Sequence, residues 1–130
     1  MTNLVSIITA IHLAALSQIE SGNNDRAIGP NGEVSRYQIK PSVWAAELSG
    51  RTFSRRHPEN QQIAAGVALA IWQRRVNRFM AEYDAPPTPR MMYLLWHRPA
   101  HVFKPTAREQ ERATRFANLV LESQPKRKNP

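Results

Sequence analysis

Apolar residues recur at helical spacing near the start of the chain. The stretch consists of Leu4, Ile7, Ile8, Ile11, Ala15 and Ile19. Steps of three and four residues place such side chains on one face of a helix, and Asn3 is a suitable N-cap for it. Gly22 follows, and glycine often ends a helix because it tolerates the left-handed backbone conformation found there. The pattern predicts a first helix that ends next to Gly22, with Glu20 in its last turn.

A polar, turn-rich stretch separates this helix from the next one. Residues 23–32 are mostly polar, and the Gly-Pro-Asn-Gly sequence at 29–32 is the strongest turn signal in the chain. Residues 34–39 begin and end with good strand formers, so we expect them to form a short, exposed strand of a small β-hairpin. Pro41 then opens a short helix over residues 42–48, since proline is favoured at the first helical position.

The longest helical pattern begins at Pro58 and extends to about residue 83. Its expected buried side consists of Ile63, Val67, Ile71, Val76, Phe79 and Met80. The prolines at positions 86 and 87 form a rigid break after it.

Two shorter helices are predicted after the break. Thr88 is a suitable N-cap for a helix over residues 89–97, and residues 98–105 are expected to be irregular. Thr106 and Glu109 have the spacing of a capping box. The apolar face of this last helix contains Ala113, Phe116, Ala117 and Val120. Together the patterns predict a mainly α-helical domain.

The composition limits the chain to one domain and favours an anionic partner. A chain of 130 residues is short enough for a single domain, which we place at residues 1–121, followed by a basic, disordered tail at 122–130. The formal net charge is +8 and the isoelectric point is near 10.8. Such a charge favours cell-wall polymer, nucleic acid or a membrane surface as partner. The chain has no cysteine, which excludes disulfides and thiolate metal sites.

The first apolar stretch lacks the pattern of a signal peptide or a membrane span. No Lys or Arg precedes it. The polar residues that interrupt it are Ser6, Thr9, His12, Ser17 and Gln18. Both kinds of segment need a nearly continuous apolar run, so we expect a helix of a globular domain and no membrane span. A periplasmic, cell-envelope or secreted location is expected only if a signal was removed before residue 1.

Two segments resemble the soluble lytic transglycosylase and goose-type lysozyme superfamily. In that family a Glu-Ser pair closes a helix, an alanine begins a turn, and Gly-Leu-Met-Gln-Ile precedes a proline. The matching positions here are Glu20-Ser21, Ala27, Ser35-Arg36-Tyr37-Gln38-Ile39 and Pro41. Residues 60–66 are similar to the family's Asn-Ile-x-x-Gly helix, and the order covers roughly residues 10–105. The resemblance implies a lysozyme-like helical fold with a small β-hairpin beside the active-site cleft.

The resemblance implies that Glu20 is the general acid that protonates a glycosidic oxygen. This role needs a carboxyl that is still protonated near neutral pH, and burial beside apolar residues supplies that property. Glycoside hydrolysis normally uses a second carboxyl. The nearby candidates are Asp25 and Glu33, although carboxylates in loops are also common without a catalytic role.

Lytic transglycosylases of the resembling family use one glutamate. It donates its proton and then accepts one from the sugar's own C6 hydroxyl, which leaves a 1,6-anhydro ring. The resemblance therefore favours a lytic transglycosylase that cleaves the β-1,4 bond between MurNAc and GlcNAc. The alternatives are a muramidase that uses Glu20 and Glu33, and a non-catalytic glycan-binding or nucleic-acid-binding protein.

Six further residues are expected to bind substrate. They are Ser21, Ser35, Tyr37, Gln38, Tyr93 and Trp96. The last two lie near the family's Ala-Tyr-Asn-x-Gly-Pro sequence, for which this chain has Leu-Trp-His-Arg-Pro at 95–99. Each has another interpretation: Ser21 can bond to its own helix, Gln38 can hold the hairpin, and the aromatic residues can belong to the core.

No metal or cofactor is expected. The four histidines are His12, His57, His97 and His101. Only the last two have helical spacing, and Pro99 between them makes a shared helical face unfavourable, so they do not predict a metal site. Peptidoglycan glycan strands are the expected partner of a monomer. The Arg55-Arg56 and Arg74-Arg75 pairs support nucleic acid instead, but no nucleic-acid-binding motif accompanies them, so no nucleic-acid partner is expected.

Overall fold

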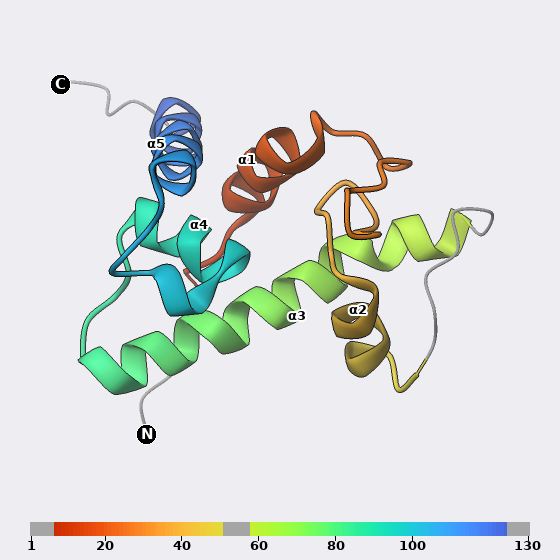
Figure 1. Ribbon diagram of the computed structural model, residues 1–130, viewed down its shortest axis with the longest axis horizontal. Coiled ribbons are helices and arrows are strands. Elements are labelled where there is room, and N and C mark those ends of the chain that lie inside the picture. Colours follow the sequence, from red (N-terminus) through yellow and green to blue (C-terminus); the bar gives the residue numbers. More distant parts are fainter. Residues whose placement is uncertain (1–6, 51–57, 125–130) are drawn as a thin grey trace, which may run out of the picture.

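The computed structural model describes residues 7–50 and 58–124. The helices are α1 (Ala10–Ser21), α2 (Pro41–Glu47), α3 (Pro58–Tyr83), α4 (Pro89–His97), the 3-10 helix η1 (Pro99–His101) and α5 (Ala107–Glu122) (Figure 1). The prediction of a mainly α-helical chain is confirmed, and the described ranges contain no strand. None of the described helices is long and apolar enough to cross a membrane.

The long helix α3 forms the base of the molecule (Figure 1). The short helix α2 packs against it near its first half, and α4 packs against its second half. The last helix, α5, contacts both α1 and α4. Segments far apart in sequence therefore surround the end of α1, which is where the Glu20 carboxylate lies.

Helix α1 ends where the sequence predicts, but it begins later than predicted. Gly22 adopts φ 64° and its N–H donates to the carbonyl of Gln18, so the helix ends where the sequence predicts. The helix begins only at Ala10, after Thr9 in extended conformation. Residues 7–9 are not helical, so the predicted start is wrong there, and the proposed cap Asn3 lies outside the described residues.

The predicted hairpin strand at residues 34–39 is wrong. Val34 and Ile39 form an isolated antiparallel bridge in which each N–H donates to the other's carbonyl at 2.8 Å. Ser35 and Gln38 between them adopt positive φ angles of 69° and 56°. The left-handed conformation at these two positions folds the segment into a tight turn, which cannot extend as a strand.

The α-helices of the second half of the chain follow the predicted boundaries, but residues 98–105, expected to be irregular, contain the 3-10 helix η1. Helix α3 spans Pro58–Tyr83, and the Thr88 hydroxyl accepts from the Met91 N–H at the start of α4. The capping box of α5 is formed by Thr106 and Glu109. α5 extends to Glu122, one residue past the predicted domain end, and residues 125–130 of the expected tail lie outside the described residues.

The core is centred on aromatic side chains that join α3, α4 and α5. Trp72 is fully buried, its indole N–H donates to the Met92 carbonyl at 2.8 Å, and its ring meets the edges of Trp96 and Phe116. One predicted core residue is wrong, because the side chain of Ile63 is 43% exposed. The next residue, Ala64, lies on the buried side of α3 instead, because consecutive residues of a helix are rotated by about 100° around its axis.

Candidate active site

A cavity of about 610 Å³ lies between the end of α1, the loop before α2, and the facing parts of α4 and α5. Its lining includes Glu20, Glu33, Gln38, Trp96, Glu109 and Arg112. A volume of this size is typical of sites for small molecules or short polymer segments. Four predicted site residues therefore line one space, although they are widely separated in sequence.

The Glu20 carboxyl lies in the wall of this cavity at the last turn of α1. Its Oε1 accepts a hydrogen bond of 2.9 Å from the hydroxyl of Tyr93. Burial raises the pKa of Glu20, the charge of Arg112 and the Tyr93 hydrogen bond oppose this, and the negative charge of Glu33 adds to it. The result is a pKa above the ordinary value. A carboxyl of this kind can hold a proton where an exposed one would have lost it.

Two neighbours fix the surroundings of Glu20. Tyr93 is fully buried on α4, and its ring is parallel to that of His97, with 5.8 Å between centroids and an interplanar angle of 8°. Arg112 on α5 donates to the carbonyl of Ile19 at 3.4 Å. The Tyr93 hydroxyl thus contacts the carboxyl from α4, and the Arg112 guanidinium acts on it from α5 through its charge.

Glu33 lines the same cavity and is held by the turn that precedes it. Its Oε1 accepts from the Asn31 N–H at 3.1 Å. A Cβ atom at Gly29 would lie 1.9 Å from Oε2 of Glu33 and 2.5 Å from Oε1 of Gln38. Only glycine leaves room for both side chains at this point.

Asp25 differs from Glu33 in its surroundings. Both oxygens of its carboxylate accept from the guanidinium of Arg36, at 2.7 and 3.0 Å. This hydrogen-bonded pair lowers the pKa of Asp25. Asp25 is not among the described residues that line the cavity. The geometry therefore leaves Glu33 as the candidate for a second carboxylate.

Three residues expected to bind substrate hold the loop instead of lining the cavity. The Ser21 hydroxyl lies 2.7 Å from the Arg36 carbonyl and also accepts from the N–H of Asn24. Ser35 is 1% exposed and its hydroxyl accepts from the Tyr37 N–H. Tyr37 itself is 6% exposed and belongs to the hydrophobic core.

Gln38 and Trp96 have both structural contacts and access to the cavity. The amide nitrogen of Gln38 donates to the carbonyls of Ala27 and Ser35, at 3.1 and 2.9 Å, so it closes the turn. The Trp96 ring is mostly buried and lies under the guanidinium of Arg75, with 5.9 Å from the central carbon to the ring centroid. Their contacts support a structural role, and their place in the cavity lining supports the predicted role in substrate binding.

A cluster at the cavity edge was missed by the sequence interpretation. Glu109 is 5% exposed, and its two oxygens lie 2.7 Å from Nδ1 of His101 and 3.2 Å from Nε2 of His97. The Thr106 N–H also donates to it at 2.9 Å. Although burial acts in the opposite direction, hydrogen bonds from Thr106 and His101 lower the pKa of Glu109 to about 2.

Pro99 explains why this cluster was missed. It does end α4, as expected, but the following turn η1 brings His101 back toward the same carboxylate. The available signal was the capping box, which places Glu109 at the start of α5. Within the described residues, no group of three or more His, Cys, Asp or Glu side chains is arranged to hold a metal ion.

Comparison of this chain with known protein families, curated proteins and solved structures found no match. Support for a function therefore comes from the side chains around the cavity and from the sequence resemblance.

Proposed function

We propose that this protein is a lytic transglycosylase that cleaves the β-1,4 bond between MurNAc and GlcNAc in peptidoglycan. The observation that carries the proposal is the Glu20 carboxyl, which lies in a cavity wall with a raised pKa and a hydrogen bond from Tyr93. The resemblance of the Glu20-Ser21 and 35–39 segments to the family gives independent support. The protein acts as a monomer in the cell envelope, where its polymer substrate is found.

Glu20 serves as both acid and base. In the first step its carboxyl proton moves to the glycosidic oxygen as the bond to C1 of MurNAc breaks. In the second step the resulting carboxylate takes the proton of the C6 hydroxyl, and O6 forms the new bond to C1. The product carries a 1,6-anhydro ring and no water is consumed. Arg112 supports this cycle because its charge stabilises the carboxylate between the two steps.

A muramidase is the second candidate, and one observation favours it. Glu33 lines the same cavity as Glu20, and its charge acts on the pKa of Glu20. Two carboxyls on opposite sides of a scissile bond are the usual arrangement for glycoside hydrolysis. In that reaction Glu33 would activate a water molecule or attack C1 directly, and the product would carry a reducing end.

Mass spectrometry of products from purified peptidoglycan separates the two reactions. An anhydro product is lighter than a hydrolysis product by one water. We expect anhydro ends from the wild type, loss of about 100-fold or more of the activity in Glu20→Gln, and retention of most activity in Glu33→Gln. Asp25→Asn is the matched control, because this loop carboxylate lies outside the cavity lining.

Three outcomes would count against the proposal. Reducing-end products together with an inactive Glu33→Gln variant would make the protein a muramidase. Full activity in a folded Glu20→Gln variant, checked by circular dichroism, would remove Glu20 from the reaction. A folded wild type that releases no product from peptidoglycan would refute cleavage altogether.

A further inference from the structure

Arg75 on α3 places a cation in the cavity wall without a carboxylate partner. Its side chain is partly buried and lines the cavity. Among the described residues no carboxylate forms an ion pair with it, whereas its neighbour Arg74 pairs with Glu47. Burial and the charge of Arg74 lower the pKa of Arg75, and no acid opposes them. Because burial of a cation costs free energy of hydration, other contacts must hold Arg75 in this place.

The guanidinium of Arg75 is bound to the end of α4. Its Nη1 donates to the carbonyl of Leu95 at 3.3 Å and to the carbonyl of Trp96. Carbonyls in the last turn of a helix lack partners within the helix. In a longer helix the Leu95 carbonyl would accept from the N–H of residue 99, but Pro99 has no N–H to donate. Arg75 therefore caps α4 from another helix, where the partial negative charge of the helix end favours a cation.

The same guanidinium covers the ring of Trp96. The distance from its central carbon to the ring centroid is 5.9 Å, which is within the range of a cation–π contact. The indole also meets the Trp72 ring at 5.8 Å with an interplanar angle of 61°. Positions 72 and 75 are one turn apart on α3, so they lie on the same side of this helix. Two side chains of α3 thus fix the orientation of Trp96.

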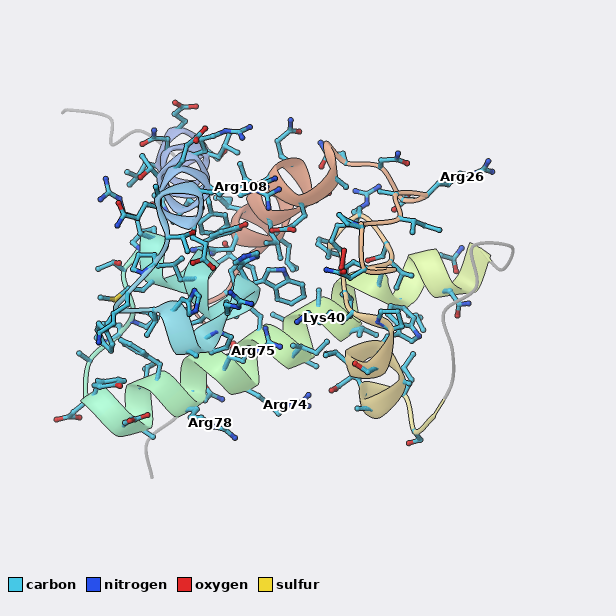
Figure 2. All side chains as sticks on the ribbon, viewed as in Figure 1. Arg26, Lys40, Arg74, Arg75, Arg78 and Arg108 are labelled. Carbon is cyan, nitrogen blue, oxygen red and sulfur yellow. The ribbon has the colours of Figure 1, made fainter. Side chains whose placement is uncertain are left out.

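The end of α4 is the part of this helix that faces the cavity. Trp96, His97 and Arg98 all belong to the cavity lining. Figure 2 shows Arg75 on the side of α3 that faces α4, whereas Arg74 and Arg78 point away from it. A shift of the last turn of α4 would therefore change the shape of the cavity wall, and Arg75 is the side chain of α3 that binds this turn through its backbone.

We propose that Arg75 is a positioning residue for glycan binding, which holds the end of α4 and the Trp96 ring where the cavity wall receives a sugar. The inference rests on the proposed function and adds a residue that acts on binding and not on proton transfer. Arg75 is not among the groups that shift the pKa of Glu20. Its loss is therefore expected to raise KM and to leave kcat and its pH dependence unchanged, as the loss of uniform binding does.

Kinetics on a soluble peptide-free glycan of alternating MurNAc and GlcNAc test this split. Arg75→Gln is expected to raise KM by about fivefold or more, as the loss of one hydrogen-bonded contact would, with kcat changed by less than about twofold. Arg78→Gln is the matched control, because Arg78 is exposed on α3 and lies outside the cavity lining (Figure 2). It is expected to keep both constants.

Arg75→Lys separates positioning from charge. Lysine keeps the cation but lacks the planar group that binds two carbonyls and lies flat on an aromatic ring. We expect this variant to raise KM by about threefold or more. It also keeps the test valid if Arg75→Gln does not fold, because an ammonium can still donate to one of the two carbonyls. Circular dichroism and urea unfolding check the fold of each variant.

A double-mutant cycle tests whether Arg75 acts through Trp96. Affinity for a peptide-free MurNAc-GlcNAc tetrasaccharide is measured by isothermal titration in full-length Glu20→Gln, which is expected to bind without cleavage. Trp96→Leu removes the ring and keeps an apolar side chain, and is expected to lose about tenfold in affinity. Addition of Arg75→Gln to it is expected to cost less than about twofold more, because residues that act as a unit are not additive.

Several results would overturn the inference. A wild-type KM in Arg75→Lys would show that charge alone is sufficient, and an equal rise in Arg78→Gln would show a general effect of charge. A fall in kcat at constant KM would place Arg75 in the reaction step, and additive losses in the cycle would indicate direct contact with the sugar. The proposed function is tested separately: a wild type that releases no product refutes it, whereas the cycle depends only on glycan binding.

Discussion

The hydroxyl of Tyr93 donates a hydrogen bond of 2.9 Å to Oε1 of Glu20 and so joins the middle of α4 to the last turn of α1. Burial raises the pKa of Glu20, whereas this hydrogen bond and the charge of Arg112 lower it. Two opposing effects therefore act on the carboxyl: burial favours the protonated acid, whereas the Tyr93 hydrogen bond and the Arg112 charge favour the carboxylate that remains after proton transfer. A residue that serves as acid and then as base needs both.

Removing a group that lowers the pKa of Glu20 and removing one that raises it are expected to shift the pH dependence of activity in opposite directions. Glu20 must be protonated to act as an acid, so activity falls as pH rises through its pKa. Tyr93→Phe removes a contact that lowers this pKa, and we expect the alkaline limb to move to higher pH. Glu33→Gln removes a charge that raises the pKa, and the limb is expected to move to lower pH. The measurement is kcat/KM on a soluble glycan against pH.

Tyr37→Phe is the matched control for this series. Tyr37 is also buried, but it does not line the cavity, so its hydroxyl is expected to have no effect on the limb. A shift of Tyr93→Phe and Glu33→Gln in the same direction would contradict the assignment of the limb to Glu20.

Local signals in the sequence are sufficient to predict the boundaries of most of the helices. Pro58 as the start of α3, Thr88 as the cap of α4 and the Thr106 capping box each depend on residues within one turn. The strand prediction failed because strand propensity at residues 34 and 39 carries no information on the backbone between them. Ser35 and Gln38 adopt left-handed conformations there, which single-residue preferences do not anticipate.

Gly29→Ala is expected to reduce activity with little effect on stability. The new Cβ would lie too close to the ends of the Glu33 and Gln38 side chains, and both must move away from their present positions. Because these are flexible side-chain ends, we expect the free energy of unfolding to change by less than about 1 kcal/mol. The measurement pairs urea unfolding with KM and kcat on a soluble glycan.

Gly66→Ala is the control for Gly29→Ala. A Cβ at Gly66, inside α3, meets no atom within 4 Å. This variant is expected to be more stable by about 0.5–1 kcal/mol, since glycine lowers helix stability, and to keep its activity. Unchanged activity in Gly29→Ala would show that the present positions of Glu33 and Gln38 do not matter for the reaction.

His12 is expected to make the protein less stable in mild acid. Its Nδ1 lies 3.0 Å from the Thr9 N–H, which can only donate, so this nitrogen accepts and carries no proton. Burial lowers the pKa of His12 below 6.5. The unfolded chain therefore binds the proton more tightly, and the stability present above pH 6.5 is lost as pH falls through the folded pKa.

The variant His12→Gln keeps an acceptor but cannot titrate in this range. Urea unfolding between pH 7 and pH 5 is expected to show a smaller loss of stability in the variant than in the wild type. Some loss is expected to remain, because the pKa of His97 is also lowered. Identical slopes in the two proteins would show that His12 is not responsible.

The site was less predictable than the helices, and His97 and His101 show why. Their convergence on Glu109 depends on the path of η1 and on the packing of α4 against α5. The spacing of the two histidines contains no information on this path or this packing. Pro99 between them also makes a shared helical face unfavourable. The family resemblance points to Glu20, and the need of glycoside hydrolysis for a second carboxyl points to Glu33 as a nearby candidate, whereas the pairing of Tyr93 with Glu20 is visible only in the folded chain.

Glu109→Gln is expected to destabilise the protein at neutral pH by about 1–3 kcal/mol, as loss of charge from a buried, hydrogen-bonded carboxylate does. The carboxylate accepts from the Thr106 N–H and contacts His101 and His97. Hydrogen bonds hold its pKa at about 2, against 4.5 in an unperturbed glutamate. Its contribution is therefore present above pH 4.5 and is lost as pH falls from there toward 2.

Glu111→Gln separates this local effect from the change of net charge. Glu111 lies on the same helix, α5, but is exposed, so the same substitution is expected to change stability by less than about 0.5 kcal/mol. Unfolding in urea at pH 7 and pH 3 gives the contrast. At pH 7 only Glu109→Gln should differ from the wild type, and at pH 3 that difference should narrow, because the wild type has then lost part of the same contribution. An equal deficit at both pH values would show that Glu109 stabilises the protein through its shape and packing, and not through the charge that the two histidines and Thr106 surround.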